Sequence, residues 1–311
     1  MAELFTKTND GELRKIGDVD SSQISRIKND ASIDDIKAEL DNYWTPKKLG
    51  KHKQLKEKHG TILLKDLLVS AKVFFEQVKS NKFKFQNFGP FSFGSFLKKA
   101  KLDKFVKMEY VDDCLKVTTP RPAIGKGEFL LASCFSNINF RDDSGDLIDD
   151  DGNRIEVKGK HATLAGEGPY KQMNKGVLFS LYRLFETNTD AKDLNLDVIE
   201  DLENKLIDNK QKLPKAMDIL QNLETPSRSL TNSMCELFNS KQDLKLVIAA
   251  THLYTYLKIQ KANYLFALND NVFWGFSAPK NLEEAYEIIS HFNVTGWVAG
   301  NKGISITVKN G

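Results

Sequence analysis

The chain has 311 residues, of which 41% are hydrophobic and 28% charged, with 19 Gly and 8 Pro. This composition predicts a folded globular protein with a sizeable core and excludes collagen-like and wholly disordered chains. The order of the predicted helices and strands indicates an α/β or α+β protein. The longest apolar stretches fall well short of the roughly 20 residues of a membrane helix, and the first residues lack a signal-peptide pattern. The three cysteines are widely spaced and form no zinc or disulfide pattern. We therefore expect a cytoplasmic protein with no membrane partner.

Charge is distributed unevenly along the chain. The formal net charge is only +3 at pH 7, but residues 45–110 hold 16 Lys against 5 acidic residues, a local excess of +11. The rest of the chain therefore carries a net charge of −8. Many of its acidic residues lie in one short run. That run contains Asp142, Asp143, Asp146, Asp149, Asp150 and Asp151. A basic segment beside an acidic cluster indicates either a phosphate-binding surface next to a cation site or two solvated faces.

The N-terminal third is predicted to be basic and largely helical. We expect a polar helical arm over residues 1–60, in which the spacing of apolar residues gives a weak helix signal at 33–43. A Phe-rich subdomain is expected over residues 61–119. That subdomain would begin with a helix at 61–79 and end with two strands at 105–119. Its lysines and phenylalanines alternate, which favours either a stacking platform for single strands or an aromatic core with outward lysines. The candidate nucleic-acid contacts are Lys82, Lys84, Lys98, Lys99 and Lys101.

The remaining chain is predicted to form three further regions. A core over 120–190 is followed by a helical segment over 191–262 and a β-β-α-β-β segment over 263–311. The core would contain a helix at 127–135, strands at 145–149 and 153–159, a Gly-rich loop at 159–168 and a helix at 170–185. The later helices are expected at 193–209, 213–223, 243–261 and 281–292. The later strands are expected at 264–268, 272–277, 294–299 and 304–309.

Two residues of one predicted strand carry the chemistry. Glu156 and Lys158 are two apart and therefore share a face, while their apolar neighbours point to the other face, which must be the buried one. Asp146, on the preceding strand, lies opposite Glu156 if the hairpin loop is the three residues 150–152 with Gly152 in a left-handed conformation. Carboxylates of this kind are the hard oxygen ligands that suit Mg²⁺ or Mn²⁺.

This arrangement resembles the PD-(D/E)xK superfamily of restriction-endonuclease-like nucleases over residues 125–168. Gly-Asp-Leu at 145–147 is similar to its "D" strand, and Glu-Val-Lys at 156–158 to its "ExK" strand. Gly-Lys-Gly-Glu at 125–128 resembles the upstream acidic helix, and the whole pattern is most similar to versions from tailed bacteriophages. Gly145 stands where the superfamily often has proline.

The resemblance implies a restriction-endonuclease-like core sheet flanked by helices. Asp146 and Glu156 would bind Mg²⁺ or Mn²⁺ with Glu128 as an auxiliary ligand, and Lys158 would assist the attacking water. The implied function is Mg²⁺-dependent hydrolysis of DNA phosphodiester bonds in the host cytoplasm. A second interpretation is a non-enzymatic phage structural or interaction protein on the same fold, with homodimer or phage protein partners and a place in the virion. A third is an exposed hairpin in which Glu156 and Lys158 merely pair along the sheet.

Overall fold

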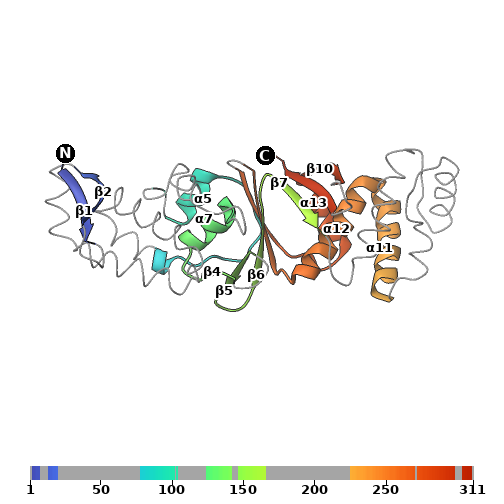
Figure 1. Cartoon of the computed structure of the whole chain (residues 1–311). Helices are drawn as coiled ribbons and strands as arrows, with labels where there is room; N and C mark the ends of the chain where they lie inside the picture. Colours follow the sequence, from blue (N-terminus) through green and yellow to red (C-terminus); the bar gives the residue numbers. More distant parts are fainter. Residues whose placement is uncertain are drawn as a thin grey trace. The chain divides into compact units, whose positions relative to one another are not determined.

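A computed structural model describes residues 2–7, 13–19, 78–101, 103, 124–141, 146–165, 225–269, 272–297 and 303–309 (Figure 1). The elements predicted at 33–43, 105–119 and between 170 and 223 lie outside these residues, as does nearly all of the helix predicted at 61–79. The chain divides into two compact units. One comprises Met1–Phe85 and Phe91–Val157, and the other Gln86–Pro90 and Lys158–Gly311. The core predicted over 120–190 spans this division.

The described residues form helices and three sheets, and this mixture of helices and strands confirms the predicted class. A six-stranded sheet has the strand order β3-β9-β8-β6-β5-β4, a three-stranded sheet has the order β10-β11-β7, and β1 pairs with β2. The strands are β1 (Ala2–Lys7), β2 (Leu13–Val19), β3 (Phe88–Ser92), β4 (Ile138–Phe140), β5 (Leu147–Asp149), β6 (Arg154–Lys158), β7 (His161–Ala165), β8 (Tyr264–Asn269), β9 (Val272–Ser277), β10 (Phe292–Trp297) and β11 (Gly303–Val308). The helices are α5 (Phe93–Lys99), α7 (Lys126–Cys134), α11 (Thr225–Lys241), α12 (Leu244–Gln260) and α13 (Leu282–Ile289).

The N-terminal arm begins with strands, which corrects the prediction of a helical region at this end. β1 and β2 pair antiparallel, from Ala2 opposite Val19 to Lys7 opposite Leu13. The physical reason can be read in the sequence between them. The sequence between the two strands contains an Asp-Gly pair at positions 10–11, which is a sequence signal for a hairpin.

The first unit has an aromatic core built around α7. Seven of the nine residues of this helix are buried, so it is apolar on every side, as expected of a helix inside a core. Phe83 and Phe96 are also buried and meet Phe135 edge-on, with ring centroids 5.2 and 5.8 Å apart. The Asn137 side chain accepts from the Phe83 amide at 2.7 Å and donates to its carbonyl at 3.2 Å. These two phenylalanines therefore belong to the core and not to an exposed stacking platform.

The second unit confirms the predicted C-terminal order of two strands, a helix and two more strands. β8 and β9 form an antiparallel hairpin in which Tyr264 lies opposite Ser277, and α13 begins after Asn281, whose side chain caps it. β7 is a correction, because a Gly-rich loop was predicted at 159–168. In β7, Ala162 and Leu164 are buried and pair with residues of β11, so the edge of a sheet orders this segment despite its glycines.

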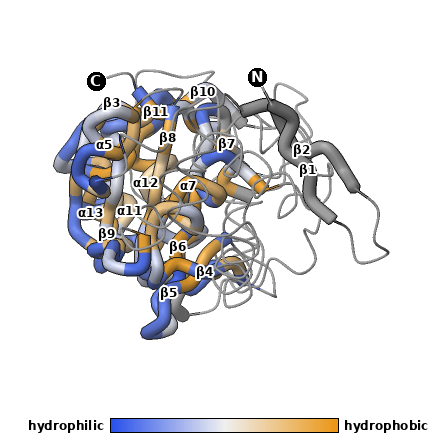
Figure 2. The backbone as a smooth tube through the Cα atoms, turned by 90° about the vertical axis from the view of Figure 1, so that its left-hand side faces the viewer, coloured by the Kyte–Doolittle hydropathy of each residue, from blue (hydrophilic) through white to orange (hydrophobic). Residues whose placement is uncertain are grey.

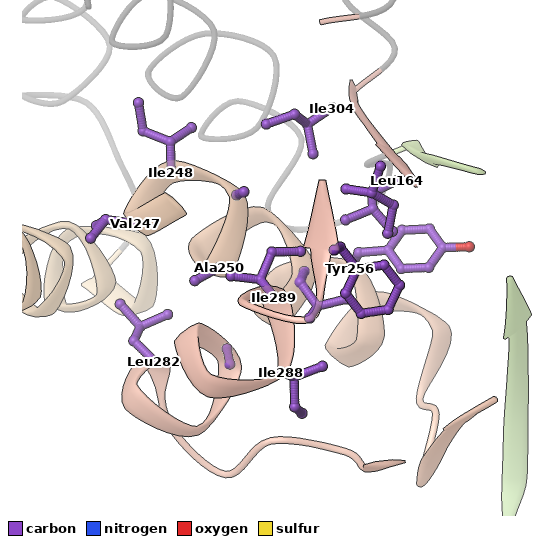
Figure 3. Packing of buried hydrophobic residues seen from close by; sticks show 14 of the residues in the cluster. Leu164, Val247, Ile248, Ala250, Tyr256, Leu282, Ile288, Ile289 and Ile304 are labelled. Carbon is purple, nitrogen blue, oxygen red and sulfur yellow. The ribbon is translucent and has the colours of Figure 1, made fainter. Parts of the chain in front are cut away.

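Helix α12 is the buried centre of the second unit, as Figure 3 shows for part of its hydrophobic cluster. It packs against α11, α13, β7, β10 and β11. The buried hydroxyls of Thr251 and Thr255 donate to the carbonyls of Val247 and His252 within the helix, which satisfies them without water. Among the described residues, no helix is long and apolar enough to cross a membrane.

Candidate active site

The β5–β6 hairpin has the register on which the sequence prediction depends. Leu147 lies opposite Ile155, and Ile148 opposite Arg154. The loop between the strands therefore consists of residues 150–152, and Gly152 has a φ of 86°. Both features were predicted and are confirmed. Continued by one residue, this register sets position 146 opposite Glu156.

The Asp146 carboxylate contacts the peptide bond that follows Glu156. Its Oδ2 accepts a hydrogen bond from the Val157 amide at 2.5 Å. Asp146 lies just before β5, so its side chain adds a hydrogen bond to β6 beyond the paired residues of the two strands. The contact brings an anionic oxygen to the strand that carries Glu156 and Lys158.

Glu156 is buried, with only 4% of its surface exposed. Ile155 and Val157 are buried as predicted, at 1% and 8%, so this strand is covered on both faces. The interpretation of an exposed hairpin therefore does not hold for Glu156. Burying a carboxylate is costly unless it is paired or binds a metal ion, and its place inside the protein is consistent with a ligand role.

Lys158 is half-buried and contacts a tyrosine that is far away in the sequence. Its Nζ donates a hydrogen bond to the hydroxyl of Tyr256 at 2.8 Å and lies 4.7 Å from the centre of the ring. The two residues are 98 positions apart. No short-range pattern connects them, and the sequence carries no signal that could have identified Tyr256.

Glu128 lies in the first turn of α7, as the sequence predicts. A Cβ atom placed on Gly125 would be 3.2 Å from Glu128 Oε1, so the carboxylate bends back over the start of its own helix. Negative charge is stabilised there by the helix dipole. This interaction with the start of the helix is sufficient to explain a glutamate at position 128. An auxiliary part for Glu128 in metal binding stays a prediction.

The acidic loop after β5 is organised by Asp149, and the tube in Figure 2 is blue there. Asp149 is buried, and its carboxylate accepts hydrogen bonds from the Asp151 amide and from the Asn153 amide and side chain at 2.7–3.0 Å. Asp150 accepts from the Asn139 side chain at 2.9 Å. These contacts build a turn, so the described part of the cluster gives no support to a separate cation site.

The described residues contain no group of three or more His, Cys, Asp or Glu side chains that could hold a metal ion together. Glu128 therefore does not complete a three-carboxylate cluster with Asp146 and Glu156. Mg²⁺ is commonly bound through one or two protein carboxylates, with waters and substrate phosphates as the other ligands. The donor set of Asp146 and Glu156 fits such an ion chemically.

The five lysines predicted to contact nucleic acid are all exposed. They are Lys82, Lys84, Lys98, Lys99 and Lys101. Lys98 and Lys99 end helix α5, where positive charge is favourable for the helix dipole, and the Lys99 ammonium lies 4.1 Å from the centre of the Phe91 ring. Their exposure allows contact with phosphates, and the helix end gives two of them a structural role as well.

Comparisons with protein-family models, with curated proteins and with solved structures find no match to this chain.

Proposed function

We propose that the chain is a metal-dependent nuclease that hydrolyses DNA phosphodiester bonds through a PD-(D/E)xK-type site, on a restriction-endonuclease-like fold of phage origin. The single observation that carries the proposal is the register of the β5–β6 hairpin. It sets position 146 opposite Glu156, with Lys158 two residues further along the same strand. A one-residue change in loop length would have set Asp146 against the opposite face.

In this proposal each residue has a distinct task. Asp146 and Glu156 would hold Mg²⁺ or Mn²⁺, and Glu128, which does not gather with them among the described residues, would have only an auxiliary part. The bound ion would neutralise negative charge on the phosphodiester and lower the pKa of a bound water. The Lys158 ammonium orients the nucleophile and stabilises the charge that develops on the phosphate oxygens. The exposed lysines of the first unit hold the DNA backbone without reading its sequence.

The test is cleavage of supercoiled plasmid by the purified full chain with Mg²⁺ or Mn²⁺, with and without EDTA. We expect nicked or linear products with metal alone and none with EDTA. The Asp146→Asn variant should lower the yield of these products strongly, whereas Asp151→Asn, at an exposed position of the β5–β6 loop, should not. Wild-type protein that leaves DNA intact with both metals would contradict the proposal.

The second candidate function is a non-enzymatic structural or interaction protein that uses the same fold, with homodimer or phage protein partners. It is favoured by the finding that no three potential metal ligands gather among the described residues. On this alternative, Glu156 is a structural carboxylate, and neither Mg²⁺ nor Mn²⁺ would bind measurably. Calorimetric titration of the wild-type protein with each metal separates the two functions before any cleavage is measured.

A further inference from the structure

Lys158 of the proposed site makes a direct contact with Tyr256 of α12. The ammonium donates to the phenol oxygen at 2.8 Å and lies 4.7 Å from the ring centroid, so it approaches the tyrosine from its hydroxyl end. A hydrogen bond with a charged donor is about twice as strong as a neutral one. One charge-assisted hydrogen bond therefore holds the ammonium at the hydroxyl end of this aromatic side chain.

Tyr256 is itself held rigidly. Only 6% of it is exposed, and it belongs to the hydrophobic cluster around α12. In Figure 3 its hydroxyl oxygen points away from the labelled aliphatic residues, so the ring is anchored in the cluster while the polar end leaves it. A tyrosine has few rotatable bonds and loses little freedom when it is packed in this way.

A lysine side chain is flexible, in contrast to a packed tyrosine, because its ammonium lies at the end of four methylene groups. A flexible ammonium samples many positions, whereas catalytic groups must be held within about 0.5 Å of their productive geometry. A fixed acceptor at the end of this side chain restricts where the charge can lie. The strand sets the direction of Lys158, and Tyr256 sets how far along that direction its ammonium is placed.

We infer that Tyr256 is the positioning residue for Lys158, which it holds through the phenol oxygen. This inference rests on the proposed nuclease function and adds to it a residue that no sequence motif contains. Tyr256 would act through Lys158 and would not touch the substrate.

The experiment compares wild type with Tyr256→Phe and with a matched control, Tyr254→Phe. Tyr254 lies on the same helix and also has a lysine, Lys258, over its ring at 5.3 Å. The first measurement is NMR of the lysine ammonium protons in the full chain, which needs no activity. We expect the Lys158 protons to exchange with water more slowly than those of the exposed Lys160 in wild type. This protection should be lost in Tyr256→Phe and kept in Tyr254→Phe.

The second measurement is metal-dependent plasmid cleavage. Tyr256→Phe should lower kcat about tenfold, the effect of losing one charge-assisted hydrogen bond, with KM and metal affinity unchanged. Tyr254→Phe should leave all three values as in wild type. Equal protection of Lys158 and Lys160 in wild type would overturn the inference without the use of any variant. A Tyr256→Phe enzyme with the wild-type kcat would overturn the inference and leave the nuclease function standing, whereas inactive wild-type protein would overturn both.

Discussion

Asn153 donates two hydrogen bonds to the carboxylate of Asp149, from its backbone amide at 2.7 Å and from Nδ2 at 2.9 Å. The Asp149 amide in turn donates to the Asn153 carbonyl at 2.9 Å. Because these bonds join the two ends of the loop, they hold it at three residues. The length of this loop sets the register that brings position 146 opposite Glu156, so Asp149 supports the candidate site from outside it.

The first prediction is that Asp149→Ala destabilises the protein. The substitution removes an acceptor from two backbone amides and one side-chain amide, which leaves partly buried donors without their partner. Such losses typically cost about 1–3 kcal/mol, to be measured as the free energy of unfolding in urea. Asp151→Ala is the matched control, because Asp151 is exposed and contacts the Asp149 carboxylate through its backbone amide, which the substitution keeps. Equal effects of the two substitutions would contradict this account of the loop.

Much of the C-terminal fold could be predicted because its boundaries are marked by strong local signals. The strand at 272–277 and the start of the helix after Asn281 are found where the sequence predicts them. From the last residue of β8 to the start of β9 the sequence reads Asn-Asp-Asn, and Asn281 is a good N-cap with Glu284 three residues later. These signals act over a few residues and need no knowledge of the partner strand.

β7 shows why the rest could not be predicted. Its five residues stand among glycines, so the local signal is typical of a loop, although Ala162 and Leu164 alternate with more polar neighbours. Pairing with β11, about 140 residues later, decides the outcome. The same limit applies to the candidate site. The three-residue turn follows from Gly152 and its neighbours, whereas the contact between Lys158 and Tyr256 depends on the tertiary fold.

The second prediction concerns acid stability and His252. This side chain is fully buried on α12, and its Nε2 is hydrogen-bonded to the Leu164 carbonyl of β7. Burial lowers the pKa of His252 to about 4, although the bond to the carbonyl opposes this shift. Since the unfolded chain takes up the proton at the ordinary value near 6.5, protonation favours unfolding. Stability should be complete above pH 6.5 and fall as the pH drops from 6.5 to 4, by about 3 kcal/mol from this residue.

Urea unfolding at a series of pH values measures this loss. His252→Gln keeps an amide donor for the Leu164 carbonyl but cannot be protonated, so its stability should change less over the same interval. His291→Gln is the control, because His291 is only half-buried. The pKa of His291 is also lowered, mainly by burial and then by the positive charge of Lys309. A wild-type profile that His252→Gln leaves unaltered would show that other groups cause the acid sensitivity.

The third prediction concerns the exposed lysines of the first unit. If they contact backbone phosphates, DNA binding should weaken steeply with salt, because each contact releases condensed counterions. The combined change of Lys98, Lys99 and Lys101 to Glu should weaken binding further and reduce the salt slope by about one for each lost contact. Fluorescence anisotropy with labelled DNA measures both quantities. The same change at Lys258, Lys261 and Lys280, which are also exposed, alters the net charge equally and should have a smaller effect.

The fourth prediction separates metal binding from chemistry at the candidate site. Asp146→Asn keeps the shape of the side chain but removes its charge, so metal affinity and the cleavage rate should both fall. Lys158→Ala should leave metal affinity unchanged and slow cleavage by about 10²–10³, the usual effect of losing one electrostatic group that acts on the transition state. Glu128→Gln should have a milder effect, because Glu128 bends back over the start of α7. Calorimetry and plasmid cleavage measure the two properties separately.

The contrast between Asp146→Asn and Lys158→Ala is the informative result, because a contaminating nuclease would respond to neither substitution. Lys160→Ala is the matched control for the lysine, since Lys160 follows the same strand and is exposed. It should cleave as fast as wild type. If Lys158→Ala also cleaved at the wild-type rate, the ammonium would have no part in the reaction, and the hydrogen bond to Tyr256 would serve the fold alone. If Lys158→Ala lost metal affinity together with Asp146→Asn, the lysine would support the ligands and would not act on the transition state.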